Sequence, residues 1–205
     1  MGDLWQPDPF PHAVIDGSWP LDQLEAAAAE FPPPQDYRWV TYPQPEEWGK
    51  RCGGPEMQGP LVRQLMAEMQ SEAQRDFLAE LTGIEGLVPS TLGGGMHMTG
   101  TGGRLAMHRD FNVEPSTGLE RRLNVLLFLN AEWDPAWGGT LYLGEHRQVS
   151  VLPLMNRMVV FECGPASWHG HPEPVTGNHW RKSVACYWYA PPRGSLDSHS
   201  TIWQR

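Results

Sequence analysis

The sequence is poor in the features that mark several large classes of protein. Lys and Arg number 15 against 24 Asp and Glu, which gives a formal net charge of −9. Because phosphate contacts need a basic surface, this charge does not favour a nucleic-acid partner. No apolar run approaches the ~20 residues that a membrane-spanning helix needs, so we expect no membrane partner.

Cysteine is also scarce. Cys52, Cys163 and Cys186 are widely spaced and include no Cys-x-x-Cys pair, so neither a disulfide framework nor a zinc knuckle is expected. The N-terminal residues lack the basic and apolar regions of a secretion signal. Reduced thiols and the missing signal together predict a cytoplasmic protein. No feature of the sequence indicates its oligomeric state.

Glycine and proline, in contrast, are abundant, with 22 Gly and 20 Pro spread along 205 residues. A chain of this length can bury one core, and frequent turns favour short strands. We therefore expect a single domain over residues 1–205. Its parts would be N-terminal helices with a possible lid in 1–86, a β core in 87–190 and a tail in 191–205.

Two stretches of the N-terminal part have helical periodicity. One follows Ser18, a candidate N-cap; the other spans 61–82, where Ser71 can cap a second segment and Gly83 is a natural stop. Between them, residues 35–60 are rich in aromatic residues and turns. A loop of this length is uncommon unless it has a function, so we expect either an active-site lid or a passive surface loop.

From Gly86 onward, short apolar runs alternate with turn signals. The stretch 122–130 is almost continuously apolar and too short for a typical helix, which predicts a buried central strand. Runs of similar length precede and follow it, about eight in all, and such a series favours a sandwich or a jelly roll.

Residues that can bind a metal stand on both sides of this buried strand. His108 and Asp110 lie two positions apart, so an extended backbone points both side chains to one face. A third ligand is available at His169 or His171. Two histidines and one carboxylate on one face of a non-haem iron leave the other face open to oxygen and substrate. Further on, Arg181 offers a planar fork for a carboxylate, and Ser183 shares its face.

Taken together, these motifs resemble the Fe(II)- and 2-oxoglutarate-dependent dioxygenases, in particular the prolyl 4-hydroxylase-like branch. The resemblance covers roughly residues 92 to 190, with a looser match at 9–16. It implies a mainly β fold with flanking helices, namely a double-stranded β-helix of the jelly-roll, cupin-like type. It also implies Fe(II) as the metal, with 2-oxoglutarate and O₂ as cosubstrates.

Carried over by residue, the resemblance implies that His108, Asp110 and His169 are the catalytic iron ligands. Arg181 and Ser183 would bind the distal carboxylate of 2-oxoglutarate. His171 is the rival third ligand; we favour His169, because the distal ligand of the family usually precedes a short turn and a Val or Pro segment. His171 would then lie beside the metal or on the substrate side.

Two positions depart from the family pattern. Many relatives have a Tyr about ten residues before the first ligand, where this chain has His97, so His97 would take the contact with the cosubstrate. Some relatives have a Tyr on the buried strand, where this chain has Phe128, which cannot donate a hydrogen bond. Asn124 lies on the same face of a regular strand and is the expected substitute.

The resemblance implies an oxygenase that hydroxylates an unactivated C–H bond and releases succinate and CO₂. The carboxylate of Asp110 argues against halogenation, since halogenating relatives have a small residue in its place. The small size of the chain favours a small polar metabolite, such as an amino acid or a natural-product intermediate, as substrate. The alternative is a peptidyl, prolyl-type hydroxylase. A non-catalytic cupin-like binding module is the alternative of another class.

Overall fold

The computed structural model describes residues 4–195 and 197–204, and these residues form two antiparallel sheets with helices outside one of them. The larger sheet has the strand order β1-β9-β6-β11-β4-β3-β2, and the smaller has the order β12-β5-β10-β7-β8. The strands are β1 His12–Asp16, β2 Val40–Thr41, β3 Lys50–Gly53, β4 Val88–Thr99, β5 Leu105–Arg109, β6 Glu120–Phe128, β7 Leu141–Leu143, β8 Val149–Val151, β9 Arg157–Glu162, β10 His169–His171, β11 Arg181–Ala190 and β12 Ile202–Trp203.

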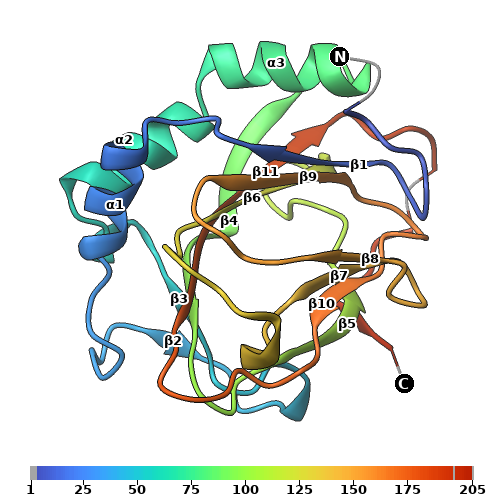
Figure 1. Cartoon of the computed structure of the whole chain (residues 1–205). Helices are drawn as coiled ribbons and strands as arrows, with labels where there is room; N and C mark the ends of the chain where they lie inside the picture. The colour runs from blue at the N-terminus through green and yellow to red at the C-terminus, as the bar shows by residue number, and fades with distance from the viewer. Residues whose placement is uncertain (1–3, 196, 205) are drawn as a thin grey trace.

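Three α-helices lie outside the larger sheet, on the side away from the smaller one (Figure 1). They are α1 Leu21–Ala29, α2 Pro60–Met69 and α3 Glu72–Thr82. The predicted ends of α3 are confirmed: the Ser71 hydroxyl accepts from the Gln74 backbone N–H at 3.1 Å, and Gly83 closes the helix with φ of 72°. The predicted cap at Ser18 is wrong, because Pro20 precedes α1 and no side chain caps it.

Alternation along β6 and β11 divides the interior into two layers. Residues of one parity face the helices and form the larger apolar core, where Trp188 and Val125 pack with Leu65. Residues of the other parity face the smaller sheet, and there Phe128 and Phe161 belong to a second core. This arrangement is the double-stranded β-helix that the motifs imply, so the predicted fold class is confirmed.

The stretch 35–60 is not the structureless loop that its turns predicted. It contains β2 and β3, which extend the larger sheet beyond β4, and two short 3₁₀-helices at Pro45–Glu47 and Pro55–Met57. Period-2 alternation could not mark β3, because the strand is only four residues long and includes Gly53. Pairing with β4 supplies the hydrogen bonds that define it.

The C-terminal residues also form part of a sheet. β12 pairs with the outer edge of β5, where Trp203 lies opposite His108 and Ile202 opposite Arg109. The segment before it is attached to the site by Asn112, whose side chain donates to the Asp197 carbonyl at 2.8 Å and accepts from the His199 N–H at 2.9 Å. The predicted tail thus covers the strand that carries the first metal-ligand candidate.

Candidate active site

The structure brings His108, Asp110 and His169 together. His108 lies on β5 and His169 on the antiparallel neighbour β10, in directly paired positions, and Asp110 follows the end of β5. The Nε2 atoms of His108 and His169 lie 3.5 Å and 3.3 Å from the Asp110 carboxylate oxygens. One potential ligand atom of each residue falls within 4.8 Å of the others, which fits three ligands around one ion.

Both histidines present the nitrogen that a metal needs. Nδ1 of His108 lies 2.9 Å from the Ala106 carbonyl, and Nδ1 of His169 lies 2.9 Å from the Ser167 carbonyl. A carbonyl can only accept, so Nδ1 carries the hydrogen and the Nε2 lone pair points toward Asp110. Burial, with the neighbouring His169, lowers the pKa of His108, which keeps its ring neutral and able to bind a cation.

The Asp110 carboxylate is held by two residues of β6. Its Oδ2 accepts from the Asn124 amide at 2.8 Å and lies 3.1 Å from Nη2 of Arg121. Burial would raise the pKa of Asp110, but the neighbouring Arg121 guanidinium overcomes this effect, and the pKa lies well below its usual value. Asn124, expected to contact the cosubstrate, contacts the carboxylate here. Arg121 was expected near the site only as an exposed charge that could attract an acidic group, not as a partner of Asp110.

His171 lies apart from the three-residue cluster. A register irregularity between His169 and His171 shifts the strand, and His171 faces an inner cavity beside Arg181. Its Nδ1 is buried without a hydrogen-bond partner in the described part of the chain. Burial, with Arg181 next in effect, lowers the pKa of His171 well below its ordinary value, so the ring is neutral. The geometry favours His169 over His171 as a ligand.

A cavity of about 60 Å³ extends from the metal-ligand candidates into the barrel. It is lined by the other predicted site residues together with several neighbours: Lys50, His97, Thr99, Leu105, Asn124, Leu126, Leu141, His171, Arg181, Ser183 and Tyr187. Arg181 is 6% exposed, and its Nε donates to the Gly139 carbonyl at 2.8 Å. Burial lowers its pKa to about 9. None of the described carboxylates lies within ion-pair distance of this buried cation, so an anionic ligand suits the cavity.

Lys50 is a second cation of this cavity that sequence reasoning missed. In the sheet, Arg181 pairs with Thr99 and Thr99 pairs with Lys50, which sets the three residues in one row across β11, β4 and β3. The next row holds Ser183, His97 and Cys52. No sequence signal identified Lys50, because its position depends on β3 pairing with β4.

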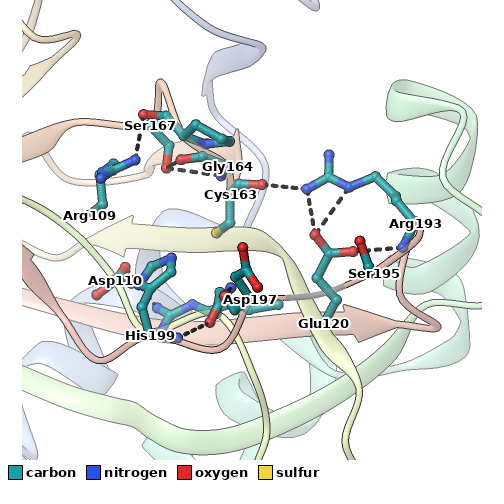
Figure 2. A pocket seen from close by; sticks show the side chains of 13 residues that line it. Arg109, Asp110, Glu120, Cys163, Gly164, Ser167, Arg193, Ser195, Asp197 and His199 are labelled. Atoms are coloured by element: carbon teal, nitrogen blue, oxygen red, sulfur yellow. Dashed lines mark hydrogen bonds and ion pairs between the residues drawn. The ribbon is translucent and has the colours of Figure 1, made fainter.

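Two larger hollows reach Asp110 from outside the barrel. The first, of about 300 Å³, has Asp110 on one side and the ion pair of Glu120 and Arg193 on the other, with Asp197 and His199 of the tail between them (Figure 2). The second, of about 310 Å³, lies between the Gln44–Lys50 segment and residues Ser200–Trp203. His108 and Lys50 line both the second hollow and the inner cavity, so the two spaces are neighbours.

The donor set and the cavity fit one metal ion and a small dianion. Two imidazoles and a carboxylate suit Fe(II), and the buried guanidinium of Arg181 suits a carboxylate at the far end of the cavity. The fold and this arrangement therefore match the site that the sequence motifs predict.

Comparison with known proteins points to the superfamily that the sequence motifs resemble. Residues 94–190, slightly less than half of the chain, match the model of the 2OG-Fe(II) oxygenase superfamily. The chain is 35% identical over 79 residues to the mouse protein "Prolyl 3-hydroxylase OGFOD1", a match that covers 35% of this chain and 14% of that relative. The chain thus corresponds to a minor part of the relative's length.

Solved structures share the fold. A Pseudomonas putida prolyl-4-hydroxylase matches with a TM-score of 0.63 and 20% identity, over 88% of this chain and 92% of that one. A prolyl hydroxylase from Trichoplax adhaerens, solved with a hypoxia inducible factor oxygen degradation domain peptide fragment, matches with a TM-score of 0.63 and 15% identity, over 87% and 83% of the two chains.

These findings confirm the predicted resemblance to Fe(II)/2-oxoglutarate-dependent dioxygenases of the prolyl 4-hydroxylase-like branch. The matched stretch contains His108, Asp110 and His169, the cluster that could hold a metal ion. Catalysis with Fe(II), 2-oxoglutarate and O₂ stays a prediction for this chain. Among the described residues, no helix is both long and apolar enough to cross a membrane.

Proposed function

We propose that this protein is an Fe(II)- and 2-oxoglutarate-dependent hydroxylase that acts on an amino-acid side chain within a peptide, with proline as the first residue to test. This proposal takes the alternative substrate class of the sequence analysis in place of a small metabolite. The relatives named prolyl hydroxylases support the choice, and so does the shape of the site.

In this proposal His108, Asp110 and His169 hold the iron, and Arg181 with Ser183 holds the distal carboxylate of 2-oxoglutarate. His97 and His171 line the walls of the cosubstrate cavity. Asn124 orients Asp110 through its 2.8 Å hydrogen bond. The buried cluster of three ligand candidates is the observation that carries the proposal.

Bound Fe(II), 2-oxoglutarate and O₂ supply the oxidising chemistry, in which one oxygen atom enters succinate and the other enters the substrate as a hydroxyl group. The overall change converts R–H, O₂ and 2-oxoglutarate to R–OH, succinate and CO₂. The chain's own contribution is to fix the ligands in orientation, neutralise the cosubstrate with Arg181 and exclude water from a buried cavity.

The hollows outside the barrel support a peptide substrate. The inner cavity of about 60 Å³ is small, whereas hollows of about 300 Å³ and 310 Å³ flank Asp110 on two sides. An extended peptide can place one side chain at the metal and continue into both hollows. A free amino acid would leave most of this space unused, so the geometry favours a chain over a single residue.

The test is turnover of the anaerobically iron-loaded protein after air is admitted, with 2-oxoglutarate and a library of proline-containing peptides, and with free proline and other amino acids in parallel. We expect stoichiometric succinate and a product that is one oxygen atom heavier, from peptides but not from free amino acids. If free amino acids were oxidised and peptides were not, the substrate would be a small metabolite and not a peptide.

The same experiment separates the oxygenase from a non-catalytic binding module. Absence of the visible charge-transfer absorption of an Fe(II)–2-oxoglutarate complex, together with no succinate from any substrate, would contradict the oxygenase. The matched control is His108→Ala, which removes a ligand candidate and is expected to lose both signals.

A further inference from the structure

We infer that Arg121 is a positioning residue, which with Asn124 occupies the Oδ2 atom of Asp110 and leaves only Oδ1 for the metal. The inference rests on the proposed function, since it assigns a role toward the ion that Asp110 would bind. A carboxylate that binds through one oxygen uses one coordination position. The position that the second oxygen would take then remains available to the cosubstrate.

Two polar contacts of the Arg121 side chain lead to this carboxylate. Its Nη2 lies 3.1 Å from Oδ2 of Asp110, and its Nε donates to Oδ1 of Asn124 at 2.7 Å. Asn124 in turn donates to the same Oδ2 at 2.8 Å. The three side chains thus form a closed triangle at Oδ2, which accepts a hydrogen bond from Asn124 and forms an ion pair with Arg121. The His169 ring lies 3.3 Å from Oδ2, and Oδ1 has only the His108 ring within ion-pair distance, at 3.5 Å.

Packing fixes the guanidinium of Arg121 in this geometry. The side chain is 1% exposed, and its guanidinium carbon lies 3.5 Å from the ring centroid of Tyr187 and 4.9 Å from that of Phe111. A buried arginine is costly unless it is paired, and Asp110 is the one carboxylate within ion-pair distance of it in the described part of the chain. A cation held between two rings cannot move away when Asp110 turns toward a metal.

A strand irregularity brings Arg121 into the site. Leu123 and Val125 face the helices, and regular alternation would point Arg121 the same way. Along the pairing of β6 with β11, Leu123 lies opposite Trp188 and Arg121 lies opposite the next residue, Tyr189. Arg122 therefore has no partner on β11 and is the extra residue of a β-bulge in β6. This bulge turns Arg121 to the inner face, where Asn124 and Asp110 lie.

The test compares Arg121→Met, which removes the charge, with Arg121→Lys, which keeps the charge but not the planar fork. Each variant is loaded with Co(II), which does not turn over, and 2-oxoglutarate binding is measured by calorimetry alongside the visible Co(II) spectrum. Both variants should bind 2-oxoglutarate roughly tenfold or more weakly, the size that loss of an outer-shell partner has at other metal sites. The Co(II) spectrum should change in both, because Oδ2, then held by Asn124 alone, can turn toward the ion as an additional ligand.

The control is Arg122→Met, one position along the same strand. Arg122 lies 3.4 Å from Glu162, outside the site, and its loss should leave 2-oxoglutarate affinity and the Co(II) spectrum as in the wild type. Thermal melts establish whether each variant folds. If Arg121→Met does not fold, the 2-oxoglutarate affinity and Co(II) spectrum of Arg121→Lys test the inference.

Wild-type affinity and spectrum in a folded Arg121 variant would overturn the inference, and so would a Lys variant that binds like the wild type. If the wild-type protein itself bound neither Co(II) nor 2-oxoglutarate, the proposed function would fail instead, so the two failures are distinguishable.

Discussion

His169 and His171 are two positions apart, but their ring nitrogens meet different surroundings. Nε2 of His169 lies 3.3 Å from Asp110, whereas His171 faces the cavity beside Arg181. We expect His169→Ala to lose Fe(II) and Co(II) binding, and His171→Ala to bind metal as the wild type does while binding 2-oxoglutarate more weakly. Calorimetric titration of the two variants with Co(II) measures the difference. Equal loss of metal in both would reopen the choice of ligand.

Arg181 is the cation against which the cosubstrate carboxylate would lie. Truncation in Arg181→Met removes the charge that this carboxylate needs, and Arg181→Lys keeps the charge but loses the bidentate fork. We expect the affinity for 2-oxoglutarate to fall by ~100-fold or more in the first, as loss of a buried charged hydrogen bond costs about 3 kcal/mol, and by less in the second. Co(II) affinity, measured in the same titrations, should stay within a few fold of wild type, since Arg181 holds no ligand candidate.

Local spacing was enough to find some site residues and not others. His108 and Asp110 share a face of any extended strand, and Arg181 and Ser183 do so as well, so their pairing could be read from the sequence. Arg121 could not, because the bulge in β6 reverses its direction. The burial of His12, which is 4% exposed, could not be read either, because it depends on the pairing of β1 with β9 and on the Phe10 ring 6.2 Å away.

At the scale of elements, the C-terminal segment forms a wall of both outer hollows. It is attached by Arg193 to Glu120 at one end and by β12 to β5 at the other. The ring of Trp203 lies 5.1 Å from the ring of His108. We expect Trp203→Ala to raise KM for the peptide substrate several-fold and to leave 2-oxoglutarate affinity unchanged. Steady-state kinetics against each substrate checks this split, and equal KM for the peptide would show that the tail has no part in binding.

The attachment of this segment should depend on pH through Glu120. Burial alone would raise the pKa of Glu120, but the hydrogen bonds from Arg193 outweigh burial and bring the pKa below its ordinary value of 4.5. A lowered pKa contributes stability above the unfolded value, and the contribution is lost as pH falls through the folded value. Because the Arg193 side chain is 43% exposed, we expect Glu120→Gln to cost only about 1 kcal/mol at pH 7. Denaturant unfolding at a series of pH values from 7 down to 2 measures it, and a cost that stays constant over this whole range would contradict the assignment.

Elements that depend on local signals were predictable, and those that depend on distant pairing were not. Ser71 and Gly83 bracket α3 because a cap and a left-handed stop act within one turn of the chain. β3 and β12 are four and two residues long, and each exists only because β4 or β5 offers an open edge. The lid predicted for 35–60 remains a prediction, although its Gln44–Lys50 part lines a hollow at the site.

At the scale of the whole molecule, the helix-side core that stabilises the fold is separate from the layer that contains the candidate site. The helices pack on one face of the larger sheet, and the ligand candidates lie on the other side, between the sheets. Leu65 is fully buried in the helix-side core. We expect Leu65→Ala to destabilise the protein by about 2–5 kcal/mol, from lost transfer energy and the cavity it leaves. Co(II) affinity should not change at a temperature where the variant is folded, and a parallel loss would show that the two layers are coupled.

Ligand binding should in turn stabilise the whole fold, because the proposed metal site draws its residues from β5 and β10 and from the turn between β5 and β6. A ligand that binds only the folded state, at 100 times its dissociation constant, adds about 2.7 kcal/mol. For a chain of this size, each kcal/mol raises Tm by about 2–4 °C, so Co(II) at that concentration should raise Tm by roughly 5–10 °C. We expect 2-oxoglutarate to raise Tm further when Co(II) is present and much less when it is absent, since the cosubstrate binds partly through the metal. The comparison with His108→Ala decides the cause: a Co(II) shift that survives in this variant would place the ion elsewhere in the molecule.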